Sequence, residues 1–276
     1  MERKTGPFVK WAGGKTQLLE KLESRMPTSY GRYYEPFIGG GALLFHLQPR
    51  VAVINDINEQ LLNVYRQLKI DAEAVIKTVN ALDEEPCDEE RYKDYRRIYN
   101  AKIQAHELDA ECAALMIWIN KHCFNGLYRV NSKGLFNVPY NKKVGGRSID
   151  ANNLRNIGTY LRDNNIEIRQ GDFEAACFDV KPGDFVYFDS PYIPISKTAN
   201  FTDYTKDGFS LEDHRRLSSL YRKLAEQGVY VMLSNHSVPL VQELYSGFKI
   251  VQIEVRRAIN SDASKRSGKE VIITNY

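Results

Sequence analysis

The stretch Phe185-Val186-Tyr187-Phe188-Asp189-Ser190-Pro191-Tyr192 begins with four apolar residues and then changes to an acid, a serine, a proline and a tyrosine. Short apolar runs that end in polar or acidic residues are typical of strands buried on both faces of a parallel sheet. Residues 52–55 and 166–169 have the same character. Helical apolar spacing lies between these runs, as at Leu154, Ile157 and Leu161. The alternation predicts an α/β fold.

Further strands are expected on both sides of this stretch. Tyr33 and Tyr34 indicate a first strand, and residues 229–233, 250–255 and 271–274 indicate three later ones. We expect the last two to pair around the polar loop 256–269.

Between residues 71 and 149 the pattern changes to a charged amphipathic helix, an apolar helix around residues 113–119 and a stretch rich in Gly, Asn and Lys. Residues 125–140 alternate and turn near Gly134, as a β-hairpin does. We therefore expect a main domain formed by residues 1–70 and 150–276. Residues 71–149 would be an inserted helical and β-hairpin subdomain.

Composition sets outer limits. Lys and Arg total 38 against 35 Asp and Glu, so the formal net charge of +3 permits a polyanion partner without demanding one. The charged amino terminus and the shortness of the longest apolar stretch, residues 112–119, predict a cytoplasmic protein without a membrane span. The four cysteines show no metal-binding or disulfide spacing, so we expect no metal site and interpret His122 beside Cys123 as structural.

The tetrapeptide Asp189 to Tyr192 indicates a chemistry of its own. A carboxylate at a strand end can accept the amino protons of a flat nucleobase, which the stiff Pro191 and the ring of Tyr192 can hold. This combination favours methyl transfer onto the base. The alternative is a strand that ends in a proline-containing turn, with Tyr192 in the core. For the tetrapeptide taken alone, that alternative is the commoner case.

Three glycines, Gly39 to Gly41, follow the first strand and let a ligand approach the backbone. Asp56 stands 17 positions after Gly39, close to where an acid binds ribose hydroxyls in Rossmann-like folds. The Gly-x-Gly-x-x-Gly spacing of a pyrophosphate cradle is missing. These features favour S-adenosylmethionine, which has a ribose and no phosphate, over a dinucleotide.

A second glycine element, Gly13-Gly14-Lys15-Thr16, resembles the end of a phosphate-binding loop. Val9 stands where that loop needs its first glycine, so the spacing argues against ATP. Lys15 can instead bind a carboxylate. The alternative is a surface lysine after a turn, with Trp11 in the core.

Together these elements resemble the Dam and DpnII type of DNA adenine-N6 methyltransferase, in the D12 class with the alpha order of motifs. The resemblance covers nearly the whole chain. The segments that match in order are residues 8–15, 34–41, 55–56, 125–140, 171–173, 189–192, 199–202 and 233–235. The resemblance implies a Rossmann-like methyltransferase sheet, S-adenosylmethionine as methyl donor and double-stranded DNA as substrate, with GATC as the expected target.

The resemblance also assigns contacts to the methyl donor. They are Trp11 and Lys15 at the methionine end, Phe37, Gly39 and Asp56 along the pocket and the ribose, and Asp172 and Phe173 at the adenine. At the adenine, a carboxylate can accept from the amino group while an aromatic ring covers the face of the base. For Asp172, a turn residue before a helix is the alternative interpretation.

Within the tetrapeptide, the resemblance implies three roles. The exocyclic amine of adenine is a poor nucleophile because its lone pair is delocalised into the ring. If Asp189 and the backbone carbonyl of Ser190 each accept an amino hydrogen, the pair becomes localised on nitrogen. Tyr192 would stack on a base flipped out of the duplex. The family usually has proline where Ser190 stands. Serine keeps the backbone carbonyl, so we expect activity to persist. The carbonyl is less rigidly aimed, because the fixed φ of proline is lost.

In the insert, residues 121–131 interleave cations, aromatic rings and amides. By resemblance, Arg129 contacts a base of the target site, and Phe124 and Asn125 help to fill the gap left by the flipped adenine. Asn131 and Tyr140 support the hairpin within this DNA-binding set. Candidate phosphate contacts are Lys142, Lys143, Arg147, Arg256, Arg257, Lys265, Arg266 and Lys269. Without the resemblance, a solvated hairpin with ordinary surface charges would be favoured.

Two rival functions stay open at this point. The first is methylation of RNA bases or amides, which the hairpin with Arg129 disfavours. The second is a silent DNA-binding protein that kept the fold, for which Ser190 is the one hint in the motifs. The sequence also leaves open a functional partnership with a restriction endonuclease and the oligomeric state.

Overall fold

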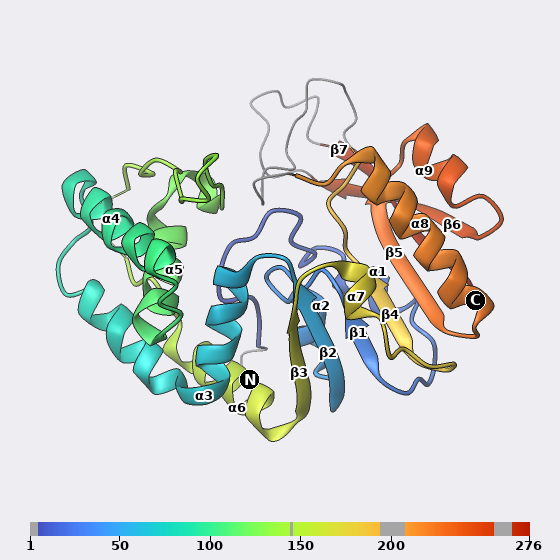
Figure 1. The fold of residues 1–276 in the computed structure, drawn as a ribbon, viewed down its shortest axis with the longest axis horizontal. Coiled ribbons are helices and arrows are strands. Elements are labelled where there is room, and N and C mark those ends of the chain that lie inside the picture. Colours follow the sequence, from blue (N-terminus) through green and yellow to red (C-terminus); the bar gives the residue numbers. More distant parts are fainter. Residues whose placement is uncertain (1–4, 144–145, 194–207, 257–266) are drawn as a thin grey trace.

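The computed structural model describes residues 5–143, 146–193, 208–256 and 267–276 (Figure 1). Within them, seven strands form one sheet in the order β3-β2-β1-β4-β5-β7-β6. The first five strands run parallel, and β7 is antiparallel to β5 and β6. The bounds are β1 Tyr33–Glu35, β2 Val51–Asp56, β3 Asn165–Gln170, β4 Phe185–Phe188, β5 Tyr230–His236, β6 Lys249–Arg256 and β7 Ser267–Thr274. This sheet confirms the predicted α/β, Rossmann-like architecture.

Helices cover both faces of the sheet (Figure 1). Alternate strand residues point to opposite faces, so Tyr33 and Tyr187 join one hydrophobic cluster and Tyr34 and Val186 join the other. The first cluster includes residues of α1 Leu19–Glu23, α2 Ala42–Leu47, α3 Glu59–Leu82 and α6 Ala151–Asp163. The second includes residues of α7 Phe173–Ala176, α8 Leu211–Glu226 and α9 Pro239–Leu244. The result is a three-layer α/β structure.

The carboxyl-terminal strands pair as predicted. In the β6–β7 register Ile250 lies opposite Ile273, and in the β5–β7 register Leu233 lies opposite the same residue. β7 therefore lies between β5 and β6, and its apolar side chains Val271 and Ile273 are buried. Of the predicted loop, residues 257–266 lie outside the described part of the chain.

The insert is helical at its start. Helix α3 kinks at Asp71, whose backbone angles are φ −154° and ψ 90°, and the Asp71 carboxylate caps the following turn by accepting from the Ala74 N–H at 3.1 Å. α4 Glu89–Ala105 and α5 Ala110–His122 follow. Trp118 on α5 is fully buried and belongs to the same cluster as the residues on one face of the sheet. The insert and the sheet domain thus share one hydrophobic core.

After α5, the predicted hairpin is a narrow antiparallel loop. It is held by two isolated bridges, Cys123 to Tyr140 and Val130 to Phe136, and begins with the 3-10 turn Phe124–Gly126. The carboxamide oxygen of Asn131 closes the tip by accepting the N–H groups of residues 133 and 135 at 2.9 and 3.1 Å. Proline at position 139 has no N–H for a continuous ladder.

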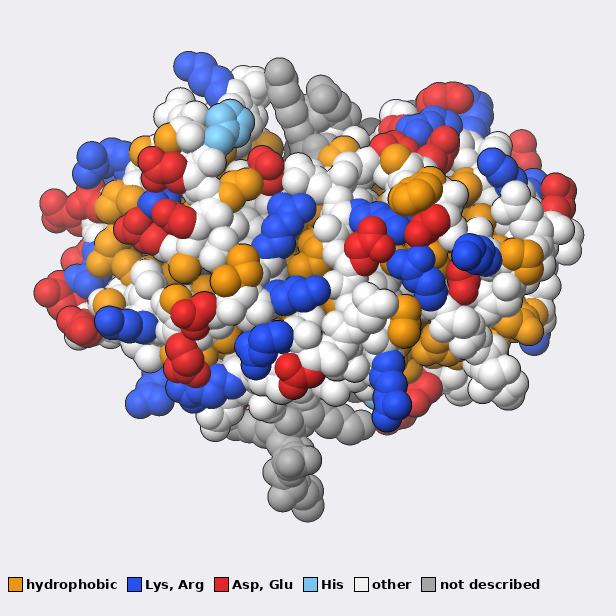
Figure 2. Space-filling view, turned by 60° about the horizontal axis from the view of Figure 1, so that its bottom comes forward, with side chains coloured by type: hydrophobic (Ala, Val, Ile, Leu, Met, Phe, Trp, Pro, Cys, Tyr) orange, Lys and Arg blue, Asp and Glu red, His pale blue; other side chains and the backbone are white. Residues whose placement is uncertain are grey.

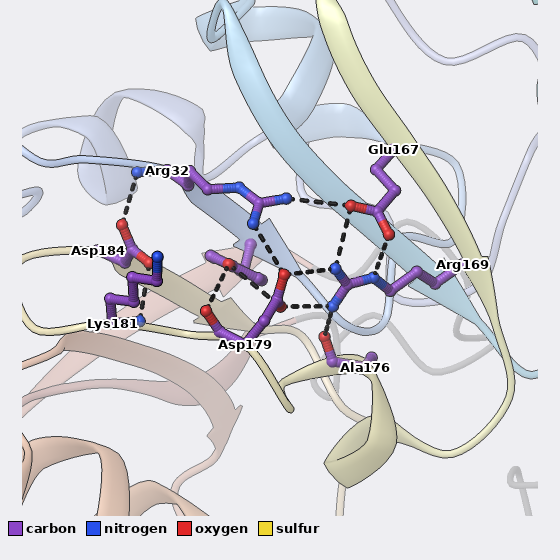
Figure 3. Close-up of polar contacts among 8 residues, drawn as sticks. Arg32, Glu167, Arg169, Ala176, Asp179, Lys181 and Asp184 are labelled. Carbon is purple, nitrogen blue, oxygen red and sulfur yellow. Dashed lines mark hydrogen bonds and ion pairs between the residues drawn. The ribbon is translucent and has the colours of Figure 1, made fainter.

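A group of paired charges, here named the Asp179 cluster, joins β3 to the segments before β1 and β4 (Figure 3). Arg169 donates to both oxygens of the Asp179 carboxylate at 2.7 and 2.8 Å. The Arg32 guanidinium donates to Asp179 at 2.9 Å and to Glu167 at 3.1 Å. The backbone N–H of Arg32 donates to the Asp184 carboxylate at 2.8 Å. The cluster consists of Arg32, Glu167, Arg169, Asp179 and Asp184, and it fixes these segments to one another.

On the face drawn in Figure 2, basic, acidic and apolar side chains are interspersed. Among the helices of the described ranges, none has the length and apolar character needed to cross a membrane.

Candidate active site

The candidate site lies at the point in the sheet where the strand order reverses, between β1 and β4. β1 and β4 are parallel neighbours, and the connections that follow them lead to opposite halves of the sheet. In open α/β sheets, ligands bind at such a point, beside the carboxyl ends of the strands. The glycine segment that contains Gly39 follows β1, and the tetrapeptide that begins with Asp189 follows β4. The fold therefore brings the two predicted motifs to the same edge.

Lys15 and Asp189 form the central contact of the site. The Lys15 ammonium lies 2.7 Å from the Asp189 carboxylate, and the two side chains are 4% and 19% exposed. The ammonium also donates to the Gly13 carbonyl and lies 4.6 Å from the centre of the Tyr192 ring. The structure thus brings together two residues predicted for different tasks, one for the cofactor and one for catalysis.

Asp189 is held from the neighbouring strand. The Ser234 hydroxyl on β5 donates to its carboxylate at 3.2 Å and lies 2.8 Å from the Tyr187 hydroxyl on β4. Burial raises the pKa of Asp189 above its usual range, while the charge of Lys15 lowers it in part. The Ser234 hydroxyl therefore orients the Asp189 carboxylate, and the charge of Lys15 offsets only part of the effect of burial on its pKa.

The rest of the tetrapeptide is anchored to β5 and β7. The Tyr192 hydroxyl donates to Glu270 on β7 at 2.9 Å, and the Tyr192 and His236 rings pack edge to face with centres 4.7 Å apart. Asn235 accepts the next backbone N–H, that of Ile193, at 3.0 Å. Pro191 is half-buried. Ser190 is buried, and its hydroxyl has no hydrogen-bond partner among the described residues.

A second carboxyl group, Glu35, ends β1 beside the site. It is buried and accepts from the Tyr33 hydroxyl at 2.6 Å. Burial raises the pKa of Glu35 to about 8, and the negative charge of Asp189 adds to this shift. Glu35 is therefore protonated at neutral pH.

Sequence reasoning did not assign a site role to Glu35, Ser234, Asn235 or Glu270. Glu35 and the Ser234-Asn235 pair stand inside segments of the family resemblance, so a signal existed for them. Glu270 lies in no such segment, and only the register of β7 against β5 brings it to the tetrapeptide.

Three predicted cofactor residues meet in the loop after β1. The Gly39 N–H donates to the Asp56 carboxylate at 3.0 Å, which also accepts from the Asn58 N–H at 2.9 Å. Gly39 has φ +48°, and a Cβ there would lie 2.8 Å from the Trp11 ring. Only glycine fits this conformation with Trp11 packed against it. Trp11, Gly39 and Asp56 are thus in mutual proximity, and Tyr65 supports the loop by donating to the Gly39 carbonyl at 2.9 Å.

The predicted adenine contacts have partners within the protein. Asp172 caps α7 by accepting from the Glu174 N–H at 2.9 Å, and it pairs with Arg216 at 3.0 Å. The Phe173 ring stacks on Phe37 with centres 5.3 Å apart, and the Arg216 guanidinium lies 5.0 Å from its centre. The capping interpretation of Asp172 is confirmed, and it leaves the carboxylate partly exposed beside this aromatic group.

The predicted DNA-contacting residues fall into two sets. Phe124 is 51% exposed, and Asn125 and Lys142 are also exposed, with φ of +57° and +60°. Arg129 is exposed, and its Nε donates to Asn137 at 2.8 Å. By contrast, Asn131 closes the loop tip, and the Tyr140 hydroxyl donates to the Cys87 carbonyl at 2.7 Å. Residues 199–202, together with Arg257, Lys265 and Arg266, lie outside the described ranges.

His122 has the structural setting predicted for it. Its Nε2 lies 2.9 Å from the Ser148 hydroxyl, and its ring packs on Trp118 with centres 4.3 Å apart. The four cysteines are buried as free thiols. Within the described ranges, no group of three or more His, Cys, Asp and Glu side chains is arranged to hold a metal ion.

Comparisons with known proteins agree with this geometry. The family model of the D12 class N6 adenine-specific DNA methyltransferases matches residues 11–259. The type II methyltransferase M1.LlaDCHI of Lactococcus lactis subsp. cremoris is 46% identical over 98% of this chain and 95% of its own length. The type II methyltransferase M.MjaIII of Methanocaldococcus jannaschii is 40% identical over 98% and 99%, and the DNA adenine methylase of Escherichia coli (strain K12) is 29% identical over 99% and 96%. The chain is therefore an adenine-specific DNA methyltransferase and belongs to the D12 class of N6 adenine-specific enzymes.

Proposed function

We propose that S-adenosylmethionine is the methyl donor and binds along the loops after β1, β2 and β3. Lys15 would hold the donor's carboxylate, and Asp56 would accept from the ribose hydroxyls with the lone pairs that its two backbone contacts leave over. Asp172 and the Phe37–Phe173 pair would contact the adenine. The donor supplies an electrophilic methyl group on a positively charged sulfonium.

The charges around Asp189 fit such a cationic donor. Glu270 acts on this carboxylate and raises its pKa, whereas Glu35 is protonated at neutral pH. Among the described residues, Lys15 is the cation that forms an ion pair with Asp189. A positive sulfonium near Asp189 and Glu270 would be stabilised in a site of low dielectric.

We propose that the acceptor is the exocyclic amine of an adenine flipped out of double-stranded DNA. Asp189 would accept one amino hydrogen and the Ser190 carbonyl the other, so that the nitrogen lone pair faces the methyl group. Tyr192 would stack on the base and offset part of the few kcal/mol that unstacking costs. The observation that carries this proposal is the 2.7 Å contact between Lys15 and Asp189, because it joins the donor end of the site to the acceptor end.

We propose GATC as the target, as the family resemblance implies. The bond from Arg129 Nε to Asn137 orients the guanidinium, whose terminal nitrogens match the acceptor edge of guanine. Phe124 and Asn125 would fill the gap left by the flipped adenine, and Lys142 would contact a phosphate. Asn131 and Tyr140 would keep the loop in shape.

The test is to treat double-stranded DNA with the protein and S-adenosylmethionine and to map methylated adenines by sequencing. We expect methylation at GATC. Arg129→Ala should relax the choice of base, at a cost of about 1–3 kcal/mol at its base pair, whereas Lys142→Ala should weaken binding to all sequences alike. Methylation confined to RNA, or no methyl transfer to any DNA, would refute the proposal.

We also propose a protective role beside a restriction endonuclease, because two of the similar proteins are named type II methyltransferases. DNA methylated by this protein should resist a GATC-cleaving nuclease that is blocked by N6-methyladenine. Cleavage equal to that of untreated DNA would refute this role at that site.

A further inference from the structure

Glu270 is a carboxylate outside the recognised motifs that contacts the catalytic tetrapeptide. It lies on β7 opposite His236 in the antiparallel β5–β7 register. Its Oε2 accepts from the Tyr192 hydroxyl at 2.9 Å. A strand far from the tetrapeptide in sequence therefore supplies the partner of its aromatic residue.

The Tyr192 ring is held at several points around this hydrogen bond. His236 packs edge-on against the ring, with centres 4.7 Å apart and planes at 77°. The Lys15 ammonium lies over the ring at 4.6 Å from its centre. Asn235 accepts the N–H of Ile193, the residue that follows Tyr192. The bond to Glu270 fixes the hydroxyl end of the side chain, on which Ser234 also acts.

We propose that Glu270 is a positioning residue for methyl transfer, which fixes the plane of Tyr192 on which the target base stacks. The inference rests on the proposed function, in which Tyr192 is that platform. A tyrosine side chain without this anchor keeps its stacking area and gains rotational freedom. A base stacked on a mobile ring spends less time with its amine aligned to Asp189, and small errors of alignment at the reacting atoms have large effects on rate.

The size of the effect follows from the bond that is lost. A hydrogen bond to a charged group contributes about 1.5–3 kcal/mol, which corresponds to roughly a 10- to 100-fold change in rate if the bond acts in the transition state. DNA affinity should change little, because Phe124, Arg129 and Lys142 in the insert are the proposed DNA contacts.

The experiment is single-turnover methyl transfer to a GATC duplex, with DNA affinity measured on the same samples. The variants are Glu270→Ala, Glu270→Gln, Tyr192→Phe and the double variant Tyr192→Phe with Glu270→Ala. Glu254→Ala is the matched control, because Glu254 is an exposed acid on the adjacent strand β6. Thermal unfolding of each variant reports whether the fold is intact.

We expect Glu270→Ala and Tyr192→Phe each to slow methyl transfer roughly tenfold or more at unchanged DNA affinity. Glu270→Gln should keep most of the rate, because an amide oxygen still accepts the hydroxyl. The double variant should be no slower than the slower single variant, because both changes remove the same bond. Glu254→Ala should match the wild type.

Additive losses in the double variant, or a wild-type rate in Glu270→Ala, would overturn the inference. If Glu270→Ala does not fold, equal loss of rate in Glu270→Gln and Tyr192→Phe would do the same, since the glutamine retains an acceptor. Asp189→Asn in the same assay distinguishes failure of the positioning role from failure of the proposed function. Methyl transfer that depends on Asp189 and not on Glu270 removes only the positioning role, whereas a wild type that transfers no methyl group removes the proposed function itself.

Discussion

The Asp179 cluster and the Asp189 site use charge in opposite ways (Figure 3 shows the former). Asp179 contacts two guanidinium groups, and its bonds to Arg169 and Arg32 hold the pKa of its carboxyl well below the usual range. Asp189 pairs with Lys15 while the acid Glu270 acts on it as well, and burial raises its pKa. In the cluster, Glu167 and Asp179 each accept from two guanidinium groups. In the site, Lys15 is the one cation that forms an ion pair with Asp189 among the described residues, and the acid Glu270 acts on the same carboxylate.

This difference separates groups that stabilise the fold from groups kept for binding and chemistry. A paired acid lowers the free energy of the folded state at neutral pH. A buried acid with a raised pKa does the reverse, and such groups occur where function needs them. Asp189 and the nearby Glu270, with Lys15 as the cation that pairs with Asp189, form the expected environment for a cationic methyl donor.

Removing the cation of the site should have the largest effect. In Lys15→Met, Asp189 loses its ion pair, so its pKa should rise further and the donor's carboxylate loses its proposed partner. We expect methyl transfer to fall by roughly 10²- to 10³-fold. The measurement is the rate at saturating DNA, with Lys77→Met, an exposed residue on α3, as control. Equal rates in both variants would show that Lys15 has no part in the site.

Replacing Glu35 by glutamine should have an intermediate effect, and the quantity affected should be the free energy of unfolding. The pKa of Glu35 is about 8 in the folded protein and about 4.3 in an unfolded chain, so the folded state holds a proton that the unfolded state releases. Wild-type stability should therefore fall as pH rises from about 5 to 8 by an amount on the order of a few kcal/mol. Glu35→Gln should remove this loss. Unfolding free energies at several pH values test it, and a gap between variant and wild type that does not grow with pH would contradict it.

Breaking the Asp179 cluster should have the smallest effect, and the opposite dependence on pH. The pKa of Asp179 is lowered on folding, so its contribution is present above the unfolded pKa of about 4 and is lost as pH falls below it. Asp179→Asn should cost about 1–2 kcal/mol at pH 7 because its partners are partly exposed, and less in acid. Denaturant titrations at pH 7 and pH 3.5 give both numbers. A methyl-transfer rate well below that of the wild type in this variant would contradict the distinction between the two regions, because the cluster would then contribute to catalysis.

Much of the fold follows from the sequence because buried parallel strands leave a simple pattern. The apolar run at residues 185–188 and the strand at 52–55 lie in β4 and β2, and the pairing of β6 with β7 was also expected. The kink of α3 falls at Asp71, next to the predicted start of the insert. The shared hydrophobic core was not predictable, because the packing of α5 against α3 depends on contacts between distant segments.

For the site, residue types were easier to predict than their pairing. The sequence predicts a role for both Lys15 and Asp189, but it does not predict their contact. Lys15 lies in a loop assigned to the methyl donor, and Asp189 lies in the catalytic tetrapeptide. Glu270 could not be found from local pattern, since a glutamate in an alternating strand is indistinguishable from a solvated one. Its role depends on strand register, which the linear sequence does not contain.

The central claim is that Asp189 serves the chemistry of the site, and one variant tests it most directly. Asp189→Asn keeps the size of the side chain and removes its charge. In single-turnover methyl transfer from S-adenosylmethionine to a GATC duplex, we predict a loss of roughly 10²- to 10⁴-fold with DNA affinity retained and the fold intact. A wild-type rate in this variant would contradict the account.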